Sequence, residues 1–428
     1  MKKFYLIIIS LLLLIVSFLS GYFLNSYKEN ISSKYKLQNF NTFKGEYNKA
    51  DIFALNNSSN TKIKETITQI ESDGNVLLNS NSYPTVTDKT SLIAKGETNH
   101  DFAAMTPYLF NDPSSKTGYT VKDGVDNPER LDSSKFDSQR LAKLVSNLNT
   151  LSFSYALTGN QSYATKAVQF LKVWFLNPAT KMNPNMNFGE FFVTSTGKTY
   201  TFNNSNMISA IPFIQVVNDI YLLEDSNSLS SSDLEGLKDW FNSFSAWLTT
   251  SSNLSFNTLK IDNHGTWLQS ELSLFNAFAG NKENTLKSLT SVGPDVITPQ
   301  IKDGGKIPSA LIRTKSVDYT EYNLEAFITL ADIGQQFSIP IWNYTSIYGG
   351  NIKSAITYLN NYLLGKDNWP YQNISGKNVH EEDNGSFISY LALAYNFYKD
   401  PSFLKTINTY SKDSTGISYL ILESRLIN

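Results

Sequence analysis

The chain of 428 residues contains no cysteine and only three histidines, His100, His264 and His380. The lack of cysteine excludes disulfides, thiolate metal sites and a cysteine nucleophile. The sequence also lacks a His-x-x-x-His pair, an EF-hand loop, a P-loop, a Gly-x-Ser-x-Gly elbow and a Gly-x-Gly-x-x-Gly loop. We therefore expect no metal site and no organic cofactor.

Charged residues are also scarce, at 17% of the chain, and the formal net charge is -2. This balance provides no long-range attraction to nucleic acid, which we do not expect as a partner. Hydrophobic residues make up 41% of the chain, which is typical of a globular protein with a large core. An acidic polymer could still be held by a local cluster of Lys, Arg and Asn side chains.

The N-terminal segment is typical of an export signal. Lys2 and Lys3 precede a run from Phe4 to Leu24 without any charge. Residues 1–25 are therefore predicted to be a signal peptide or an uncleaved signal anchor. In both cases the rest of the chain enters the secretory pathway, and we expect an extracellular, cell-surface or periplasmic protein that is monomeric. Residues 26–60 are rich in Asn, Ser and Lys and are predicted to be a flexible lead-in. Export in a eukaryotic host would make Asn160, Asn253, Asn343 and Asn373 glycosylation acceptors.

From residue 137 onward, apolar residues recur at intervals of three and four, which predicts amphipathic helices. Examples are Leu141, Leu144, Leu148, Leu151 and Tyr155. No long stretch alternates apolar and polar residues, so an all-α fold is expected, mostly or wholly helical. Many helices of similar length favour an incomplete (α/α) toroid or barrel of helical hairpins over residues 61–428. Two long segments without this periodicity, 81–136 and 177–206, are candidate lids or binding loops.

His264 lies in the stretch Asp262-Asn263-His264-Gly265-Thr266-Trp267, directly before a strongly apolar helical run that Thr266 is expected to cap. A histidine at a helix start projects into the cavity that the helix borders. An imidazole can serve as a base or as a hydrogen-bond donor near neutral pH. A structural or exposed histidine remains the alternative.

Arg313 and Tyr319 lie in a loop before a second helical run, expected to begin near Glu321. An arginine can bind a carboxylate through two parallel hydrogen bonds and so acidify the neighbouring C–H bond. A tyrosine can protonate a leaving oxygen, or act as a base when cations stabilise its phenolate. The alternative is a surface charge beside a packed aromatic ring. A third stretch, from His100 to Glu129, is dense in turn formers and aromatics, and Tyr108 within it is a candidate for stacking on a sugar ring.

At these residues the chain resembles the alginate lyase family, polysaccharide lyases with an (α/α) toroid fold. Three ordered blocks between about residues 80 and 400 carry the resemblance. They are His100-Asp101-Phe102 with Pro107-Tyr108-Leu109-Phe110, Asp123-Gly124 and Asn127-Pro128-Glu129; then Asp262 to Trp267; then Asp303-Gly304 with Arg313-Thr314, Ser316, Tyr319 and Asn323-Leu324-Glu325-Ala326. The family's Trp-Pro is replaced by Leu109-Phe110-Asn111, its first Asn of the second block by Asp262, and the His that often follows its catalytic Tyr by Thr320.

The resemblance implies that Asn263, His264, Arg313 and Tyr319 are catalytic. The residues that it implies for substrate binding are Tyr108, Trp267, Asn127, Tyr322 and His100. The implied reaction is β-elimination on a 1,4-linked uronate polymer, without a metal or an organic cofactor. Either His264 or Tyr319 would remove the C5 proton, and Tyr319 would protonate the leaving oxygen.

Two other functions remain open from the sequence. A glycoside hydrolase on a helical toroid would need two facing carboxylates, for which the candidates are Asp101, Glu129, Asp303 and Glu325. A non-catalytic carbohydrate-binding protein at the cell surface would need only the aromatic and polar side chains. The presence of the four candidate catalytic residues together favours the lyase.

Overall fold

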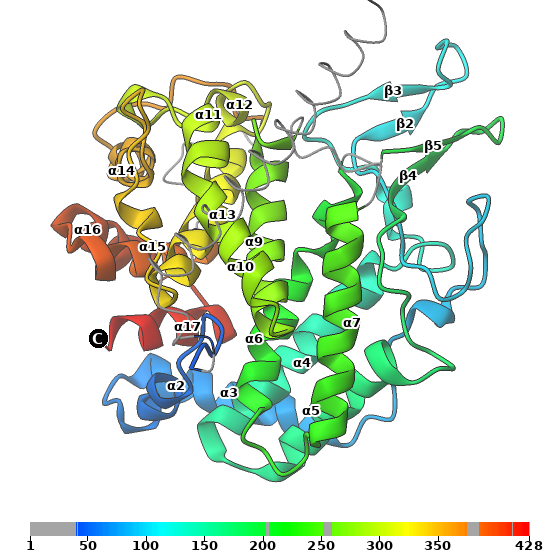
Figure 1. Ribbon diagram of the computed structural model, residues 1–428, viewed down its shortest axis with the longest axis horizontal. Coiled ribbons are helices and arrows are strands. Elements are labelled where there is room, and N and C mark those ends of the chain that lie inside the picture. The colour runs from blue at the N-terminus through cyan, green and yellow to red at the C-terminus, as the bar shows by residue number, and fades with distance from the viewer. Residues whose placement is uncertain are drawn as a thin grey trace, which may run out of the picture.

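The computed structural model describes Phe40 and residues 42–202, 205–250, 259–374, 385–412 and 414–427. The predicted export signal at residues 1–25 and His380 lie outside these residues. Helices dominate, as the periodicity predicts, and strands are few. The molecule has its helices gathered in one body and its strands rising beside them (Figure 1).

The elements keep the labels of Figure 1. The longer helices are α3 (Thr61–Leu78), α4 (Ser138–Thr158), α5 (Gln161–Leu171), α6 (Pro212–Leu223), α7 (Ser231–Thr250), α9 (Asn263–Phe278), α10 (Lys282–Ser291), α13 (Ser316–Gln336), α14 (Ile352–Leu363), α15 (Gly385–Tyr398), α16 (Pro401–Tyr410) and α17 (Gly416–Leu426). The shorter ones are α2 (Lys49–Ala54), α11 (Thr298–Gln300) and α12 (Pro308–Leu311). Short helical turns are η2 (Leu55–Asn57), η3 (Val86–Asp88), η4 (Pro128–Leu131), η5 (Lys172–Leu176), η6 (Asn206–Ala210), η7 (Val292–Ile297), η8 (Asp303–Gly305) and η9 (Ile341–Asn343).

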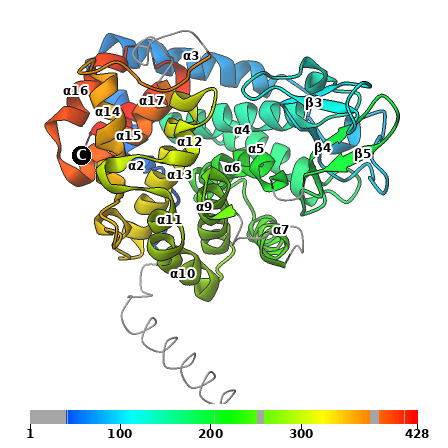
Figure 2. The same cartoon turned by 90° about the horizontal axis from the view of Figure 1, so that it is seen from above.

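Seven of these helices form a ring. In chain order α3, α4, α6, α9, α13, α15 and α17 each contact the next, and α17 returns to contact α3. Other helices pack on members of the ring: α5 on α4, α7 and α10 on α9, α14 on α13, and α16 on α15. Figure 2 shows α3 at one edge of the molecule and α10 at the opposite edge. This arrangement confirms the predicted toroid of helical hairpins.

The chain is mostly helical, as expected, but not wholly helical. The residues that the structure describes contain five short strands: β1 (Ala103–Met105), β2 (Leu109–Asn111), β3 (Tyr119–Val121), β4 (Phe188–Val193) and β5 (Thr199–Thr201). β4 pairs in parallel with β1 and antiparallel with β5, while β2 and β3 form a hairpin. They occupy the two segments that lack helical periodicity. With three to six residues each, they are too short to show a period of two.

Aromatic residues join α6 of the ring to α7 and η5, which lie outside the ring. The Phe213 ring of α6 meets the rings of Phe175, Trp240 and Phe244 edge-on, at centroid distances of 5.7, 5.5 and 5.8 Å. Such edge-to-face contacts add to the burial of apolar area. The stretch Asn206–Leu223, which includes α6, is the one described helical segment long and apolar enough to cross a membrane, but 67% of it is buried inside the fold. It is therefore a core helix.

The prediction of a flexible lead-in over residues 26–60 is wrong for the part that the structure describes. Residues 42–60 run across the ring and contain α2 and η2, and the side chains of Phe43, Ile52 and Leu55 are buried in the main core. The polar composition of this segment concealed three apolar anchors, of which only Ile52 and Leu55 are at helical spacing.

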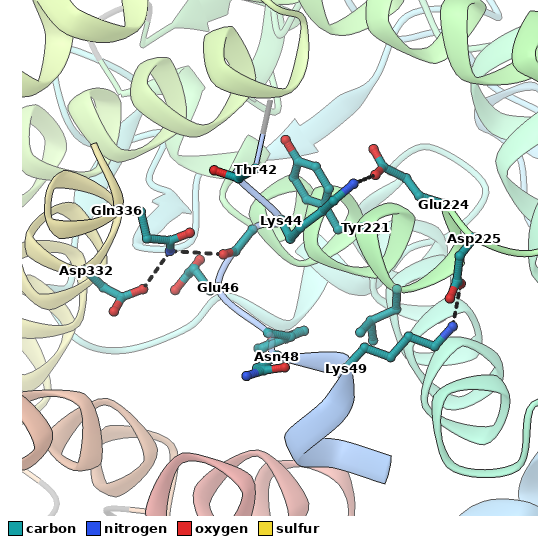
Figure 3. A pocket seen from close by; sticks show the side chains of 13 residues that line it. Thr42, Lys44, Glu46, Asn48, Lys49, Tyr221, Glu224, Asp225, Asp332 and Gln336 are labelled. Carbon is teal, nitrogen blue, oxygen red and sulfur yellow. Dashed lines mark hydrogen bonds and ion pairs between the residues drawn. The ribbon is translucent and has the colours of Figure 1, made fainter. Parts of the chain in front are cut away.

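This segment borders a cavity of about 670 Å³ between the C-terminal ends of α6 and α13 (Figure 3). Lys44 pairs with Glu224, Lys49 pairs with Asp225, and the Gln336 amide donates to the carbonyl oxygen of Gly45 at 3.1 Å. These contacts hold the N-terminal segment on the ring.

Asp332 lies on the wall of the same cavity. Burial raises the pKa of its carboxyl to about 7; Glu46 adds to the rise and Arg425 opposes it. Because the pKa is higher in the folded chain than the ordinary value near 3.9, the protonated carboxyl stabilises the fold. That contribution is complete below the ordinary pKa and is lost as the pH rises through about 7.

Asp332→Asn should therefore stabilise the protein increasingly between pH 4 and pH 7. An amide cannot ionise, so the variant avoids burying a charge. We expect its thermal unfolding midpoint to exceed that of the wild type by about 2 °C or more at pH 8. Asp225→Asn is the matched control, because Asp225 is 67% exposed and pairs at the surface. A midpoint difference that does not change with pH would contradict the prediction.

Candidate active site

A second cavity, of about 620 Å³, lies where α9 and α13 begin and is called the cleft below. Of the nine site residues predicted from the sequence, the cleft brings together Tyr108, Asn263, His264, Arg313, Tyr319 and Tyr322. The other lining residues are Thr106, Pro107, Glu190, Ser205, Ile208, Lys315, Asp318, Glu321, Glu325 and Ser386. Residues more than 270 positions apart in the chain thus share one cavity.

His264 occupies the first turn of α9. Asp262 caps this helix and accepts a hydrogen bond from the backbone N–H of His264 at 3.0 Å. The same carboxylate lies 3.0 Å from Nδ1 of the imidazole. A carboxylate at Nδ1 favours the tautomer with the proton on that nitrogen, so Nε2 is left as the proton acceptor. The helix begins three residues before the cap that we predicted at Thr266.

Two local features place this helix start. An added Cβ at Gly265 would lie 2.5 Å from Cα of Lys260, so only glycine permits the preceding turn to pack so closely. The buried Gln300 amide donates to the carbonyl oxygen of Asp262 at 2.8 Å and to the Thr266 hydroxyl at 2.9 Å. Its oxygen accepts from Asn323 of α13 at 2.8 Å. The start of α9 is therefore fixed to α13.

Tyr319 lies in the first turn of α13, which starts at Ser316 and not near Glu321 as predicted. The Arg313 guanidinium donates to the Tyr319 oxygen at 2.7 Å, and the Tyr108 hydroxyl lies 3.0 Å from the same oxygen. Burial, together with the hydrogen bond to Tyr108, raises the pKa of Tyr319, although Arg313 opposes the rise. The phenol is thus protonated near neutral pH and is a proton donor.

Arg313 already has a carboxylate partner within the chain. Its Nε donates to Asp123 at 3.1 Å, and its Nη2 forms an ion pair with the same carboxylate. Asp123 also accepts from the Thr314 backbone N–H at 3.0 Å. Hydrogen bonds from Arg313 hold the pKa of Asp123 at about 2, so its charge persists at all working pH values.

Three predicted substrate-binding residues do not line the cleft. Trp267 is 3% exposed and packs on Tyr322 with ring centroids 5.1 Å apart. Asn127 is 2% exposed; its amide donates to the Leu109 carbonyl oxygen at 2.7 Å and its oxygen caps η4. The His100 ring hydrogen-bonds the carbonyl oxygen of Lys181 at 2.7 Å. Each of these three side chains makes contacts within the protein instead.

Glu190 was missed by the sequence reasoning. It lies on β4 and faces the cleft, and Ser205 donates a hydrogen bond to it. Burial raises the pKa of its carboxyl, and His264 is near enough to oppose that rise. Nothing in the sequence around this short strand signals a site residue.

The cavity of Figure 3 has different chemistry. Its two lysines are each paired with a carboxylate, and no histidine lines it. It lies near Asp332, about 20 Å along α13 from Tyr319 at 1.5 Å per residue. Within the described ranges no group of three or more His, Asp or Glu side chains is placed to hold a metal ion. The cleft is therefore the candidate active site.

Of the four carboxylates considered for a glycosidase, only Glu325 lines the cleft. Asp101 instead accepts from the backbone and side chain of Thr98, at 2.8 and 2.7 Å. Beside its carboxyl groups the cleft holds an imidazole, a protonated phenol and a guanidinium, which suit proton abstraction and protonation of a leaving oxygen.

The comparisons with known proteins agree with this chemistry. A family model described as alginate lyase matches residues 85–369. The solved structure of an alginate lyase from Bacteroides ovatus is 26% identical, aligns over 90% of this chain and 98% of its own, and has a TM-score of 0.76. Alginate lyase A1-III from Sphingomonas species A1 is 14% identical over 77% of this chain and 87% of its own, with a TM-score of 0.48. No curated protein matches. Since the family model covers well over half of its length, the chain belongs to the alginate lyase family and is a polysaccharide lyase.

Proposed function

We propose that the protein cleaves a 1,4-linked, alginate-like uronate polymer by β-elimination, with His264 as the base and Tyr319 as the acid. One observation carries the assignment: a Tyr319 hydroxyl held between Arg313 and Tyr108 shares a cleft with an imidazole held by Asp262. A base and an acid with separate supports suit a reaction that removes one proton and delivers another.

The reaction proceeds as follows. Nε2 of His264 takes the C5 proton, the electron pair of that bond forms the C4–C5 double bond, and the C4–O4 bond breaks. O4 leaves with the proton of the Tyr319 hydroxyl. Arg313 stabilises the phenolate that remains, since its guanidinium donates to that oxygen. One product fragment keeps the O4 oxygen as a hydroxyl at its new end. The other fragment begins with an unsaturated uronate.

The substrate carboxylate attached to C5 must be neutralised for the C5 proton to be acidic. In our interpretation Arg313 serves Tyr319 more than the substrate, because two of its nitrogens bind Asp123. The Asn263 amide and the Lys315 ammonium, which also line the cleft, are left to bind the carboxylate. This differs from the arginine clamp expected from the sequence.

A syn geometry, in which the C5 proton and O4 lie on one face of the sugar, would allow Tyr319 to perform both steps. The raised pKa of Tyr319 keeps its phenol protonated, and a protonated phenol is a much weaker base than a phenolate. This favours the route in which His264 and Tyr319 each perform one step.

The apolar run at residues 4–24 supports a further proposal about location. The protein is exported and works outside the cytoplasm as a monomer, either released from the signal segment or held by it as a membrane anchor. Glycosylation at Asn160, Asn253, Asn343 and Asn373 applies only to a eukaryotic host.

A panel of uronate polymers tests the proposed function directly. Purified protein is mixed with each polymer, and ultraviolet absorbance follows the double bond conjugated to the carboxylate. New reducing ends without that absorbance would indicate hydrolysis and overturn the assignment. Binding without any cleavage would indicate the non-catalytic alternative.

His264→Ala and Tyr319→Phe should each lower kcat by about 10²-fold or more, because each removes a positioned acid or base. His100→Ala is the matched control, since His100 bonds a backbone carbonyl outside the cleft. Thermal midpoints should stay near that of the wild type. Turnover close to wild type in either cleft variant would refute the assignment of that residue.

Arg313→Lys should lower kcat by about tenfold or more although the charge is kept. A lysine cannot bond Asp123 through two nitrogens and Tyr319 at the same time. Lys315→Met is the comparison: loss of a substrate contact should raise KM and leave kcat less affected. If Arg313→Lys changes only KM, the guanidinium binds substrate and does not support Tyr319.

Tyr108→Ala should raise KM for the polymer, lower kcat, or both, because it removes an aromatic wall of the cleft and a hydrogen-bond partner of Tyr319. Tyr108→Phe separates the two effects, since it keeps the ring and removes only the hydroxyl. A Tyr108→Ala variant with wild-type kinetics would show that this wall has no part in binding or catalysis.

A further inference from the structure

The cleft has an unexpected charge balance for an enzyme of acidic polymers. Four carboxyl groups line it, from Glu190, Asp318, Glu321 and Glu325. The lining cations are Arg313 and Lys315, and Arg313 is already neutralised by Asp123. If every carboxyl were ionised, the cleft would repel a uronate. A neutral carboxyl group among them would lessen that repulsion.

Glu325 has the structural setting of a neutral acid. It lies on α13, six residues after Tyr319, and lines the cleft. The Ser386 hydroxyl at the start of α15 donates to its Oε1 at 2.6 Å. Burial raises the pKa of the Glu325 carboxyl to about 7, and the Ser386 hydrogen bond only partly offsets this.

The groups around Glu325 do not supply a counter-charge. Tyr322 on α13 and Tyr390 on α15 face it, and burial raises the pKa of both phenols, so both are neutral. Glu271 of α9 lies behind Tyr322, and burial raises its pKa well above the ordinary value. Arg425 and Glu46 form an ion pair at 4.0 Å, and both charges act on Tyr390.

We propose that Glu325 is a specificity-determining residue that binds a substrate carboxylate as a neutral carboxylic acid, through an O–H···O⁻ hydrogen bond. This inference rests on the proposed lyase function and deepens it. A hydrogen bond from a carboxylic acid to a carboxylate is short and strong. An ionised Glu325 would instead accept from sugar hydroxyls and repel the uronate. The neutral Glu325 carboxyl therefore selects sugar units that carry a carboxylate over neutral sugar units.

The dependence of KM on pH tests the proposal. Substrate carboxylates stay ionised above pH 6, so a change there belongs to the protein. At constant ionic strength, the wild-type KM should rise above pH 7, toward about tenfold per pH unit, as a single ionisation requires. Glu325→Gln keeps a hydrogen-bond donor that cannot ionise. Its KM should lie within about threefold of the wild-type value at pH 6 and stay nearly flat to pH 9.

Ser386→Ala is a second variant, in which KM should still depend on pH, unlike in Glu325→Gln. Loss of its hydrogen bond removes the contact that lowers the Glu325 pKa, so the rise of KM should begin at higher pH than in the wild type. A purely structural role of Glu325 would leave the dependence of KM on pH in both variants the same as in the wild type.

Glu190→Gln is the matched control, because Glu190 lines the same cleft from β4. If it alone flattens the profile, the proposal for Glu325 is overturned.

Proton uptake gives a readout without turnover. In a Tyr319→Phe background, calorimetry of a uronate oligomer at pH 7.5 in buffers of different ionisation enthalpy counts the protons taken up on binding. We expect uptake of a fraction of one proton, which should disappear when Glu325→Gln is added. Equal uptake with and without Glu325→Gln, or loss of activity of Glu325→Gln at pH 6 in a folded protein, would overturn the proposal. A wild-type protein that forms no unsaturated product at any pH would instead refute the lyase function.

Discussion

The bridge made by the Gln300 amide is the interaction on which the active site depends. It joins the carbonyl oxygen of Asp262 and the Thr266 hydroxyl on α9 to Asn323 on α13. The helix starts that carry His264 and Tyr319 are thereby held in one fixed relation. A buried amide with both its oxygen and its nitrogen bonded is costly to disrupt, because any displacement leaves polar atoms without partners. The rigid toroid thus supplies the precision that acid–base catalysis needs.

The fold was predictable from the sequence to the extent that it depends on helical periodicity. Leu141, Leu144 and Leu148 are fully or almost fully buried, as their spacing predicts. The strands were not predictable, because three to six residues are too few for a recognisable period. The packing of residues 42–60 was hidden for another reason. Phe43 stands apart from Ile52 and Leu55 in a segment rich in polar residues, and only tertiary contacts show that these three side chains are buried.

The catalytic candidates were predictable because each lies in a motif of consecutive residues at a helix start. Asn263, His264, Arg313 and Tyr319 do share one cleft, although their roles remain predictions. The same motifs misled for Trp267 and Asn127, since a motif records that a residue is needed and not whether it faces substrate. Glu190 could not be found, because its strand is placed at the cleft by tertiary contacts with β1 and η6 that no local pattern reveals. The Asp123–Arg313 pair joins positions far apart in the chain, and no local pattern reveals it.

The position of Asp123 has a consequence for the electrostatics of the cleft. It follows directly after the β2–β3 hairpin, outside the helical ring, whereas Arg313 belongs to the loop before α13. The counter-ion of the key guanidinium is therefore carried by a separate structural unit. The electrostatic field at the Tyr319 phenol thus depends on how that unit packs against the start of α13, and not on the helical ring alone.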